Sequence, residues 1–392
     1  MKSIKILFVF ALSLFVTDAF SQDDKLKFKT KWDNGLKIES EDEQFKLKFG
    51  GRIMADYSLF NQNNDLDNAF NKLEITEALE IRRSRFFLSG SIYNNTAFKL
   101  QIDFTDKKVS LKDVYIHLKN IPIVGNLQVG HFKEPLRLES LTTNKYITFI
   151  ERAFPTDFTP ERSNGIMIFN DFLNRRLSAQ LGYFKPSNNK GRAVTGRITG
   201  LLVNNEADNN ILHVGAGFSH RNIDTYSISA KPAHLAPEYI DTGDILNVKH
   251  VNMLSLEAAY IIKSFTLHGE YMSSDVKTDI NNYNFSSYFG QASYFITGES
   301  ANIASSYHGF GRVKPNKNLG DGDGLGAWEL AFRFTSANLD SKSIIGGQQE
   351  NISIGLNWYL NSATRIKFNN VLANVKGKGN ANVFQVRFQI DF

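Results

Sequence analysis

The chain has 392 residues, among them 28 Gly, 32 Phe, 14 Tyr, 8 Pro and no cysteine, and its formal net charge is +5. The lack of cysteine excludes disulfides and thiolate metal sites. A positive charge of this size is mild, so the positions of the cations matter more than their sum.

The first residues have the features of a secretory signal peptide. Lys2 and Lys5 give a basic start, residues 6–16 form an apolar run, and Ala19 and Ser21 supply small residues before a cleavage site at Gln22. The run is too short to span a bilayer, which takes about 20 apolar residues. We therefore expect export and removal of residues 1–21, and this compartment argues against nucleic-acid binding.

Residues 22–44 are expected to form a periplasmic lead-in or hairpin before the first long strand. Within it, residues 26–40 favour a small amphipathic hairpin with an Asn34-Gly35 turn. A loosely ordered lead-in is the alternative, and the transmembrane barrel is expected over residues 45–392.

Long alternation of apolar and polar residues is the main signal in the chain. It runs from Phe45 to Phe60, well beyond the usual soluble strand of about five or six residues, and it returns at the C-terminus, where every second residue from Phe384 to Phe392 is apolar. Further strands are expected at 79–93, 96–105, 109–119, 125–133, 163–170, 174–184, 195–204, 210–221, 248–262, 264–273, 286–298, 326–339, 349–360, 363–374 and 381–392. The sequence therefore predicts an all-β transmembrane antiparallel barrel of sixteen strands in the bacterial outer membrane.

The connections between these strands are of two kinds. Tight turns are expected on the periplasmic side, and long polar segments at 61–78, 134–162, 222–247 and 274–285 on the other side. Residues 299–325 break this rule, because a long segment stands where a periplasmic turn is expected. They contain either a hidden strand pair or an elaborated turn.

Several ordered segments resemble the phosphate-selective porin O/P family. They are Gly130-His-Phe-Lys-Glu-Pro-Leu-Arg-Leu-Glu139, residues 146–154, residues 160–165, Phe310-Gly-Arg-Val-Lys-Pro315, residues 326–333, the arginines at 82, 83 and 85, and the opening Trp32, Asn34, Gly35 and Leu36. The resemblance covers residues 26–392 and implies a trimeric porin with an anion-passing lumen. It also implies a third loop folded inward as a constriction, at the position of 134–162, and accounts for the long connection at 299–325.

Strand alternation assigns a surplus of cations to the lumen. The inward cations are Lys46, Lys48, Arg52, Arg83, Arg85, Lys99, Arg176, Arg197, Arg221, Arg333, Arg365, Lys367 and Arg387, and the inward acids are Asp56, Asp103, Asp113, Glu257, Glu270, Glu329 and Asp391. Parity is ambiguous at Arg82–Arg85, where arginines fall on both faces. Lys and Arg lining a water-filled pore favour anions, and the planar fork of Arg matches phosphate oxygens. The alternative for about half of these positions is mutual neutralisation, with Glu329–Arg333 and Asp391–Arg387 as expected pairs.

Five further cations flank or lie within the predicted constriction: Lys133, Arg137, Lys145, Arg152 and Arg162. They either form the narrowest gate or are neutralised by Glu134, Glu139, Glu151 and Glu161, which would fix the loop to the wall. Fixing is favoured for Glu151–Arg152 and Arg162, whereas both interpretations stay open for Lys145. The aromatic residues Tyr146, Phe149 and Phe154 are expected to pack the loop against the wall.

Three functions remain in view. The leading hypothesis is a passive anion porin, with phosphate preferred, that needs no cofactor, metal or catalytic residue; neither G-x-S-x-G nor H-E-x-x-H occurs in the sequence. An oligosaccharide channel would need inward aromatics, which look few, and a plugged structural barrel or adhesin would act through 222–247 and 274–285. The expected partners are small inorganic anions, outer-membrane lipid, a homotrimer, and the barrel-assembly machinery through the C-terminal Phe392.

Overall fold

The computed structural model describes residues 26–392, apart from 106–108, 187–190, 206 and 306. The predicted signal peptide at 1–21 lies outside the described residues. Among the helices of the described part, none has the length and apolar character needed to cross a bilayer.

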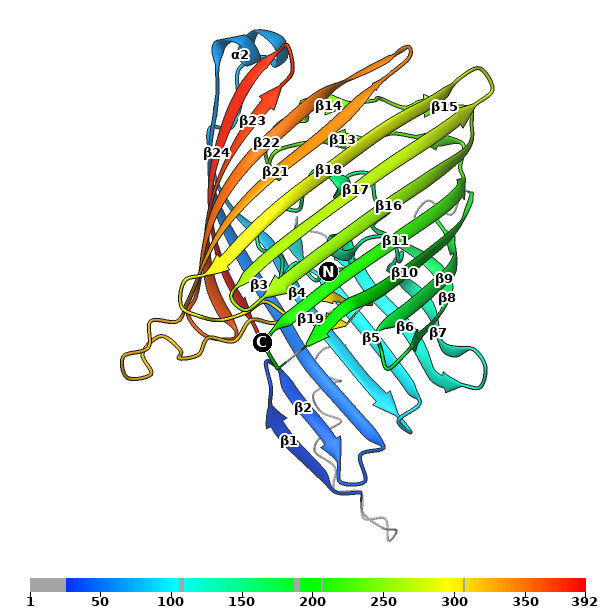
Figure 1. The fold of residues 1–392 in the computed structure, drawn as a ribbon, viewed down its shortest axis with the longest axis vertical. Helices are drawn as coiled ribbons and strands as arrows, with labels where there is room; N and C mark the ends of the chain where they lie inside the picture. The colour runs from blue at the N-terminus through cyan, green and yellow to red at the C-terminus, as the bar shows by residue number, and fades with distance from the viewer. Residues whose placement is uncertain (1–25, 106–108, 187–190, 206, 306) are drawn as a thin grey trace, which may run out of the picture.

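Sixteen long strands form one antiparallel sheet that closes on itself, because β24 pairs with β3 (Figure 1). They are β3 (Phe45–Gln62), β4 (Glu77–Ile92), β5 (Thr96–Asp103), β6 (Ser110–Ile121), β7 (Gly125–Lys133), β8 (Arg162–Phe172), β9 (Leu177–Lys185), β10 (Arg192–Asn205), β11 (Asn210–Asn222), β16 (Val248–Ile262), β17 (Phe265–Thr278), β18 (Asn282–Phe295), β21 (Ala327–Ser341), β22 (Ile344–Tyr359), β23 (Thr364–Val375) and β24 (Gly379–Asp391). The predicted fold and strand number are confirmed.

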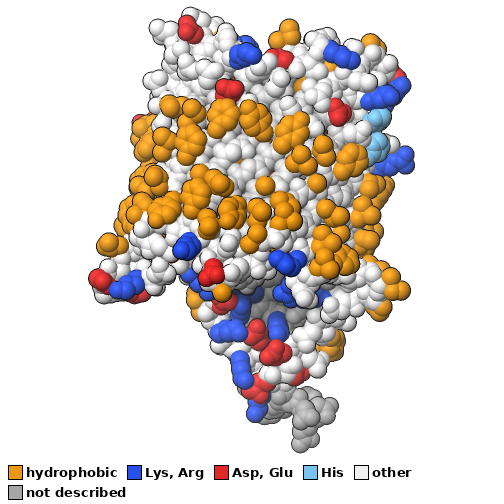
Figure 2. Space-filling model, in the orientation of Figure 1, with side chains coloured by type: hydrophobic (Ala, Val, Ile, Leu, Met, Phe, Trp, Pro, Cys, Tyr) orange, Lys and Arg blue, Asp and Glu red, His pale blue; other side chains and the backbone are white. Residues whose placement is uncertain are grey.

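The outward face of the wall explains the alternation in the sequence. Apolar side chains such as Leu181, Leu256 and Phe332 point outward and are about half exposed, and hydrophobic side chains cover the middle of the barrel (Figure 2). Trp328 and Trp358 are cross-strand partners whose rings stack with centroids 4.9 Å apart. Every second residue therefore contributes to a membrane-facing belt.

The short turns gather at the end that also carries the C-terminal Phe392, and by the usual arrangement of outer-membrane barrels this end faces the periplasm. In the β4–β5 turn, Tyr93 and Asn94 have φ values of 49° and 57°, a region that Asn adopts readily. Below this end, β1 (Phe28–Trp32) and β2 (Leu36–Ser40) form a hairpin, and β2 also pairs with β3.

The expectation of a long loop at 274–285 is wrong. β17 continues to Thr278 and β18 begins at Asn282. Here the alternation is inverted: Asp275 and Lys277 point outward and are exposed, whereas Val276 and Phe285 point inward and are buried. These strand ends rise above the belt, so their outer face meets water and their inner face packs on protein.

Three connections enter the barrel: 134–161, 223–247 and 296–326. The first contains α3 (Leu138–Leu141) and the 3-10 turn η2 (Phe154–Thr156). The second contains the short pairs β12 (Thr225–Tyr226) with β15 (Ile245–Leu246), and β13 (Ser229–Ala230) with β14 (Ile240–Asp241). The third contains β19 (Ile303–Ser305) and β20 (Gly309–Phe310), a pair outside the barrel sheet. The connection at 63–76 stays at the extracellular rim and carries α2 (Asn64–Phe70).

An apolar core fills part of the extracellular half of the barrel. Segment 223–247 contributes Tyr226, Ile228 and Ile240, which pack with inward wall residues including Met272 and Leu339. Leu136, Phe154 and Phe158 of segment 134–161 join the same cluster. This core occupies the side of the barrel formed by β16–β24 and leaves the opposite wall uncovered.

Candidate functional site

We infer from the burial of the inward side chains that the open part of the lumen runs along β4, β5 and β6. The inward side chains of β10 to β24 are nearly all buried, whereas most of those of β4 to β6 keep partial exposure; the exceptions include Arg85, Gln101 and Asp103, which are buried. Segment 134–161 lies between these two regions and is packed against the buried side. The remaining passage is therefore bounded by β4–β6 on one side and by segment 134–161 on the other.

The wall has two register shifts, one in β4 and one in β6. At each of them, two charged residues adjacent in the sequence both point toward the passage. The β3–β4 register shifts so that Met54 pairs with Arg83 but Ala55 pairs with Ile81, which leaves Arg82 as an extra residue. A β-bulge re-aims side chains in this way, and Arg82 reaches Glu151 at 3.0 Å. A similar shift in β6 lies around Lys112 and Asp113.

The passage is lined by a concentration of cations, here called the basic cluster. It consists of Arg52, Arg82, Arg83, Arg85, Lys99, Lys112, Lys133, Arg152 and Arg162. Some are paired with acids: Arg82 with Glu151 at 3.0 Å, Arg85 with Asp103 at 2.6 Å, and Lys99 and Arg162 with Asp113 at 2.9 and 2.7 Å. Four of the nine cations are thus in direct contact with a carboxylate.

The other five have no carboxylate of the described residues within ion-pair distance: Arg52, Arg83, Lys112, Lys133 and Arg152. Arg52 donates to Thr143 at 2.8 Å, and Arg152 donates to the carbonyls of Glu139 and Thr142. The buried Nε groups of Arg52 and Arg83 have no hydrogen-bond partner in the described part of the chain. Burial lowers the pKa of Arg152 to about 10, so its guanidinium is protonated at neutral pH.

On the β21–β24 side, inward cations hold the backbone of segment 134–161. Lys367 Nζ donates to the carbonyls of Ile147 and Phe149 at 2.6 and 3.0 Å, and Arg387 donates to Ile150 O at 2.8 Å. Arg333 binds Glu151 O and Arg365 binds Lys145 O. We call Arg333, Arg365, Lys367 and Arg387 the carbonyl clamp. All four side chains are buried and contact the loop, although the Nε groups of Arg333 and Arg365 have no hydrogen-bond partner among the described residues.

On the β10–β17 side, wall carboxylates bind the beginning of the same segment. Glu270 accepts from Arg137 Nη1 and from the backbone N–H of Glu139, both at 2.6 Å. Glu257 accepts from the N–H of Leu138 at 2.7 Å and pairs with Arg197. Segment 134–161 is therefore fixed from two sides by groups of opposite charge.

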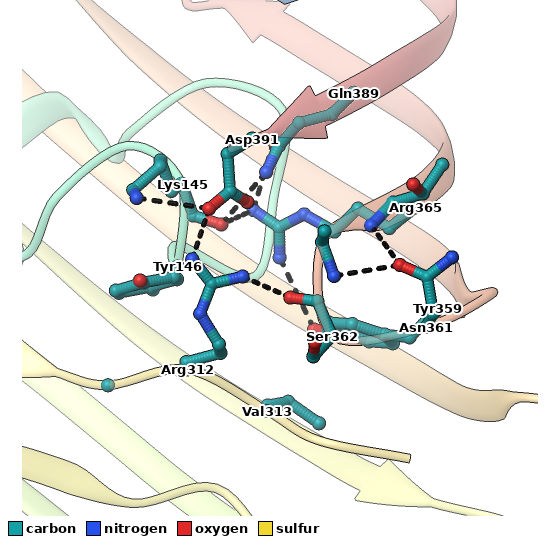
Figure 3. A pocket seen from close by; sticks show the side chains of 13 residues that line it. Lys145, Tyr146, Arg312, Val313, Tyr359, Asn361, Ser362, Arg365, Gln389 and Asp391 are labelled. Atoms are coloured by element: carbon teal, nitrogen blue, oxygen red, sulfur yellow. Dashed lines mark hydrogen bonds and ion pairs between the residues drawn. The ribbon is translucent and has the colours of Figure 1, made fainter. Parts of the chain in front are cut away.

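A small cleft of about 20 Å³ lies at the periplasmic end of the clamp. Figure 3 shows Asp391 between Lys145 and Arg312, with Arg365 and Tyr146 beside them. Lys145 lies 3.0 Å from Asp391, and Arg312, from segment 296–326, binds the same carboxylate. This carboxylate therefore links two of the three inserted segments to β24.

The comparisons with known proteins agree with this architecture. The family model for phosphate-selective porin O and P matches residues 47–392. The chain belongs to the phosphate-selective porin O and P family. Porin O of Pseudomonas aeruginosa is 25% identical over 93% of this chain and 92% of its own length, and an uncharacterised protein of Caulobacter vibrioides is 24% identical over 92% and 76%.

Solved porins share the fold. The anion-selective porin from Comamonas acidovorans has a TM-score of 0.60 at 14% identity and covers 89% of this chain and 100% of its own. The trimer form of OmpT from Vibrio cholerae has a TM-score of 0.58 at 10% identity, covering 89% and 99%. The chain is thus an outer-membrane porin of this family, and porins of this kind are channels rather than enzymes.

The structure divides the predicted lumen cations of this porin into three groups. Arg52, Arg83, Arg85 and Lys99 line the passage as members of the basic cluster. Arg197, Arg221, Arg333, Arg365, Lys367 and Arg387 are buried and bind segment 134–161 or its wall partners. Lys46, Lys48 and Arg176 lie at the periplasmic end, where Lys46 pairs with Glu43, Lys48 donates to Asp33 O and Arg176 is exposed in a turn.

The two predicted lumen ion pairs are wrong. Glu329 accepts from Asn357 and Tyr359, and Arg333 instead binds segment 134–161. Arg387 pairs with Asp56 and Glu151, and Asp391 pairs with Lys145 and Arg312. Each prediction considered one strand row alone, whereas the actual partners come from other strands and from the inserted segments.

The constriction residues are also divided. Arg137 is fully buried and donates to Thr156, Thr159 and Glu270, so it fixes the segment in place. Lys145 pairs with Asp391. Lys133 donates to the carbonyl of Ser140, and it lies in the basic cluster together with Arg152 and Arg162.

Some functional residues escaped the sequence analysis. Lys112 enters the passage at a strand irregularity that breaks the alternation, and Arg312 enters on a segment outside any long strand. Arg82, whose orientation is ambiguous from the sequence, enters at the bulge in β4. The inward rows also hold more aromatics than expected: Phe132, Phe169 and Phe184 point inward, but they pack together and are buried. They therefore form no exposed track for a sugar.

Proposed function

We propose that this porin passes small anions, phosphate among them, through the passage beside the basic cluster. The supporting observation is the set of five cations without a carboxylate partner among the described residues; Arg83, Lys112, Lys133 and Arg152 keep partial exposure, whereas Arg52 is buried. Fixed positive charge in a low-dielectric lumen concentrates anions. A series of separate cations also suits conduction, because a permeating ion must be able to leave each position.

The descriptions of related porins also support anion passage. Porin O of Pseudomonas aeruginosa lies in a family described as phosphate-selective, and the Comamonas acidovorans porin is described as anion-selective. Phosphate fits the site chemistry, since guanidinium groups such as that of the partly exposed Arg83 bind phosphate oxygens through parallel hydrogen bonds.

Planar-bilayer recording of the purified porin tests this proposal. In a potassium chloride gradient, the reversal potential is expected to have the sign of anion selectivity, and added phosphate is expected to block the chloride current. A cation-selective reversal potential would refute it. Block by oligosaccharides without block by phosphate would favour a sugar channel, and absence of any conductance would favour a plugged barrel.

The assembly and targeting of the chain complete the proposal. We propose a homotrimer, because a trimer form is described for OmpT of Vibrio cholerae, which has the same fold. Residues 1–21 would direct export, the β1–β2 hairpin would lie in the periplasm, and Phe392 would be read by the barrel-assembly machinery. The mass of the detergent-solubilised porin, measured on the same preparation, should be that of three chains, and a monomer mass would exclude the trimer.

Lys145 should give the anion selectivity a pH dependence. Burial lowers the pKa of this ammonium from 10.5 to about 8; Asp391 opposes the fall and Arg312 adds to it. Its charge is lost as the pH rises through about 8, so the anion preference should decrease between pH 7 and pH 9. Because the pKa is lower in the folded state, the charged form costs stability below pH 8, and this cost disappears as the pH rises towards 10.5.

Reversal potentials measured across this pH range check the expectation. In Lys145→Gln the step near pH 8 should be absent and the porin should show the lower anion preference at every pH. An unchanged pH profile in this variant would remove Lys145 from the conduction pathway.

A further inference from the structure

A row of basic side chains faces outward along part of the extracellular rim. It contains Lys185, Arg192, His220, His250 and Lys277, one from each of β9, β10, β11, β16 and β17, and is here called the rim row. Each member has the same strand parity as an exposed apolar or aromatic residue lower on its strand: Tyr183, Val194, Phe218, Leu254 and Tyr271. Figure 2 shows histidine beside Lys or Arg side chains at the edge of the molecule, directly above the hydrophobic belt.

The members of the rim row are neighbours across the sheet. Ala193 pairs with Phe184, so Arg192 and Lys185 lie opposite one another one step further along. His220 pairs with Asn252, two residues from His250, and their imidazole centroids are 5.2 Å apart. His250 in turn pairs with Lys277. The row is therefore a continuous strip of hydrogen-bond donors across five adjacent strands.

The rest of the rim has a different composition. At corresponding outward positions, β18, β21, β23, β24 and β3 carry amides, namely Asn284, Asn338, Asn374, Asn382 and Asn61, and β22 carries Glu350. If these outward side chains only kept the rim soluble, amides, acids and bases would all suffice. At outward strand positions, three cations and two imidazoles therefore gather on one arc, and this indicates a partner of negative charge at that arc.

We propose that the rim row binds the phosphate groups of a glycolipid in the outer leaflet, whose acyl chains lie on the apolar belt below. Lys185, Arg192 and His220 lie one outward position above the belt residues of their strands, and His250 and Lys277 lie two and three positions above, in the region where a lipid headgroup meets the protein. Cations on a lipid-facing strand cost little near the membrane interface. Arg and Lys bind phosphate through charge-assisted hydrogen bonds.

The neighbours of the row are compatible with this partner. His220 Nδ1 is 2.7 Å from Asn252 Oδ1, which leaves its Nε2 for an outside acceptor. The nearby carboxylates are engaged elsewhere, since Asp275 accepts from Asn284 at 2.5 Å and Asp279 pairs with Lys249 at 2.6 Å. Among the described residues, Arg192 and Lys277 have no carboxylate within ion-pair distance. The inference is independent of which solute crosses the pore.

Native mass spectrometry of the detergent-solubilised porin with added diphosphoryl lipid A tests the proposal. The wild type should retain bound lipid A, and the double variant Arg192→Gln, Lys277→Gln should bind it at least tenfold more weakly. The matched control is Lys342→Gln with Lys376→Gln, which removes two exposed cations from extracellular turns of β21–β24 and should bind lipid A as the wild type does. Monophosphoryl lipid A should bind more weakly than the diphosphoryl form.

Equal binding by the rim-row variant and the control would overturn the proposal, as would equal affinity for the two lipids. Displacement of lipid A by millimolar inorganic phosphate would also overturn it, because the site would then take free phosphate rather than a lipid. The substituted side chains are exposed, and an unchanged single-channel conductance would show that both variants are folded.

Discussion

Substitution of Arg83 by Gln should reduce the anion selectivity of this porin several-fold and weaken phosphate block about tenfold or more. Arg83 lies on the inward face of β4, keeps partial exposure, and has no carboxylate of the described residues in contact. A hydrogen bond to a charged group contributes about 1.5–3 kcal/mol, and about 1.4 kcal/mol corresponds to a tenfold change in affinity. Reversal potentials measure the anion selectivity, and the phosphate concentration for half-maximal block measures the strength of the phosphate block.

Two further substitutions test the reason for this effect. Arg176→Gln removes the same charge from an exposed turn at the periplasmic end and should leave both quantities unchanged. Arg85→Gln removes a cation that is paired with Asp103 at 2.6 Å, so it should weaken phosphate block and also leave a carboxylate uncompensated in the passage. If Arg83→Gln and Arg176→Gln behave alike, selectivity arises from the total charge and not from the basic cluster.

The strands could be predicted because a membrane imposes one simple rule on them. Residues such as Leu256 and Phe332 must face lipid, and their sequence neighbours must not, so the alternation is visible without any tertiary information. The rule stops where the wall rises above the membrane. At Asp275, Val276 and Lys277 the outside is polar and the inside apolar, and this inverted pattern was mistaken for a loop.

The roles of the inward cations could not be predicted in the same way. Parity places Lys367 and Arg83 on the same inner face, yet one binds two loop carbonyls and the other lines the passage. What separates them is the path of segment 134–161 through the barrel, and that path depends on long-range contacts. The bulge at Arg82 adds a second difficulty. One extra residue in a strand exchanges the inward and outward positions on its far side, so an assignment that alternates residue by residue fails beyond the bulge.

Substitution of Glu270 by Gln should release the constriction and raise the single-channel conductance. Glu270 and Arg137 form a pair with fully buried side chains, 2.6 Å apart, and Glu270 also accepts from the backbone N–H of Glu139. Removing one partner of a buried pair typically costs about 3–5 kcal/mol, because the other charge stays buried without compensation. We therefore expect a lower unfolding temperature, larger and noisier single-channel currents, and weaker anion selectivity.

Two control variants distinguish the loss of a buried charge from a change in packing. One disrupts an exposed ion pair, and the other removes both charges of the buried pair. Asp323→Asn disrupts the exposed pair of Asp323 with Lys317, where about 0–1 kcal/mol is at stake, and should change neither conductance nor stability. Arg137→Met combined with Glu270→Gln removes both buried charges, so it should recover part of the stability lost in Glu270→Gln alone.

The conductance of the double variant then identifies what holds the constriction. If it remains high, the Glu270–Arg137 contact positions segment 134–161, and the carbonyl clamp on the opposite wall is insufficient without it. Native conductance in Glu270→Gln would contradict this expectation. It would mean that Arg365, Lys367 and Arg387 hold the backbone of residues 145–150 strongly enough by themselves. These inward cations would then act mainly in fixing the loop and not in binding anions.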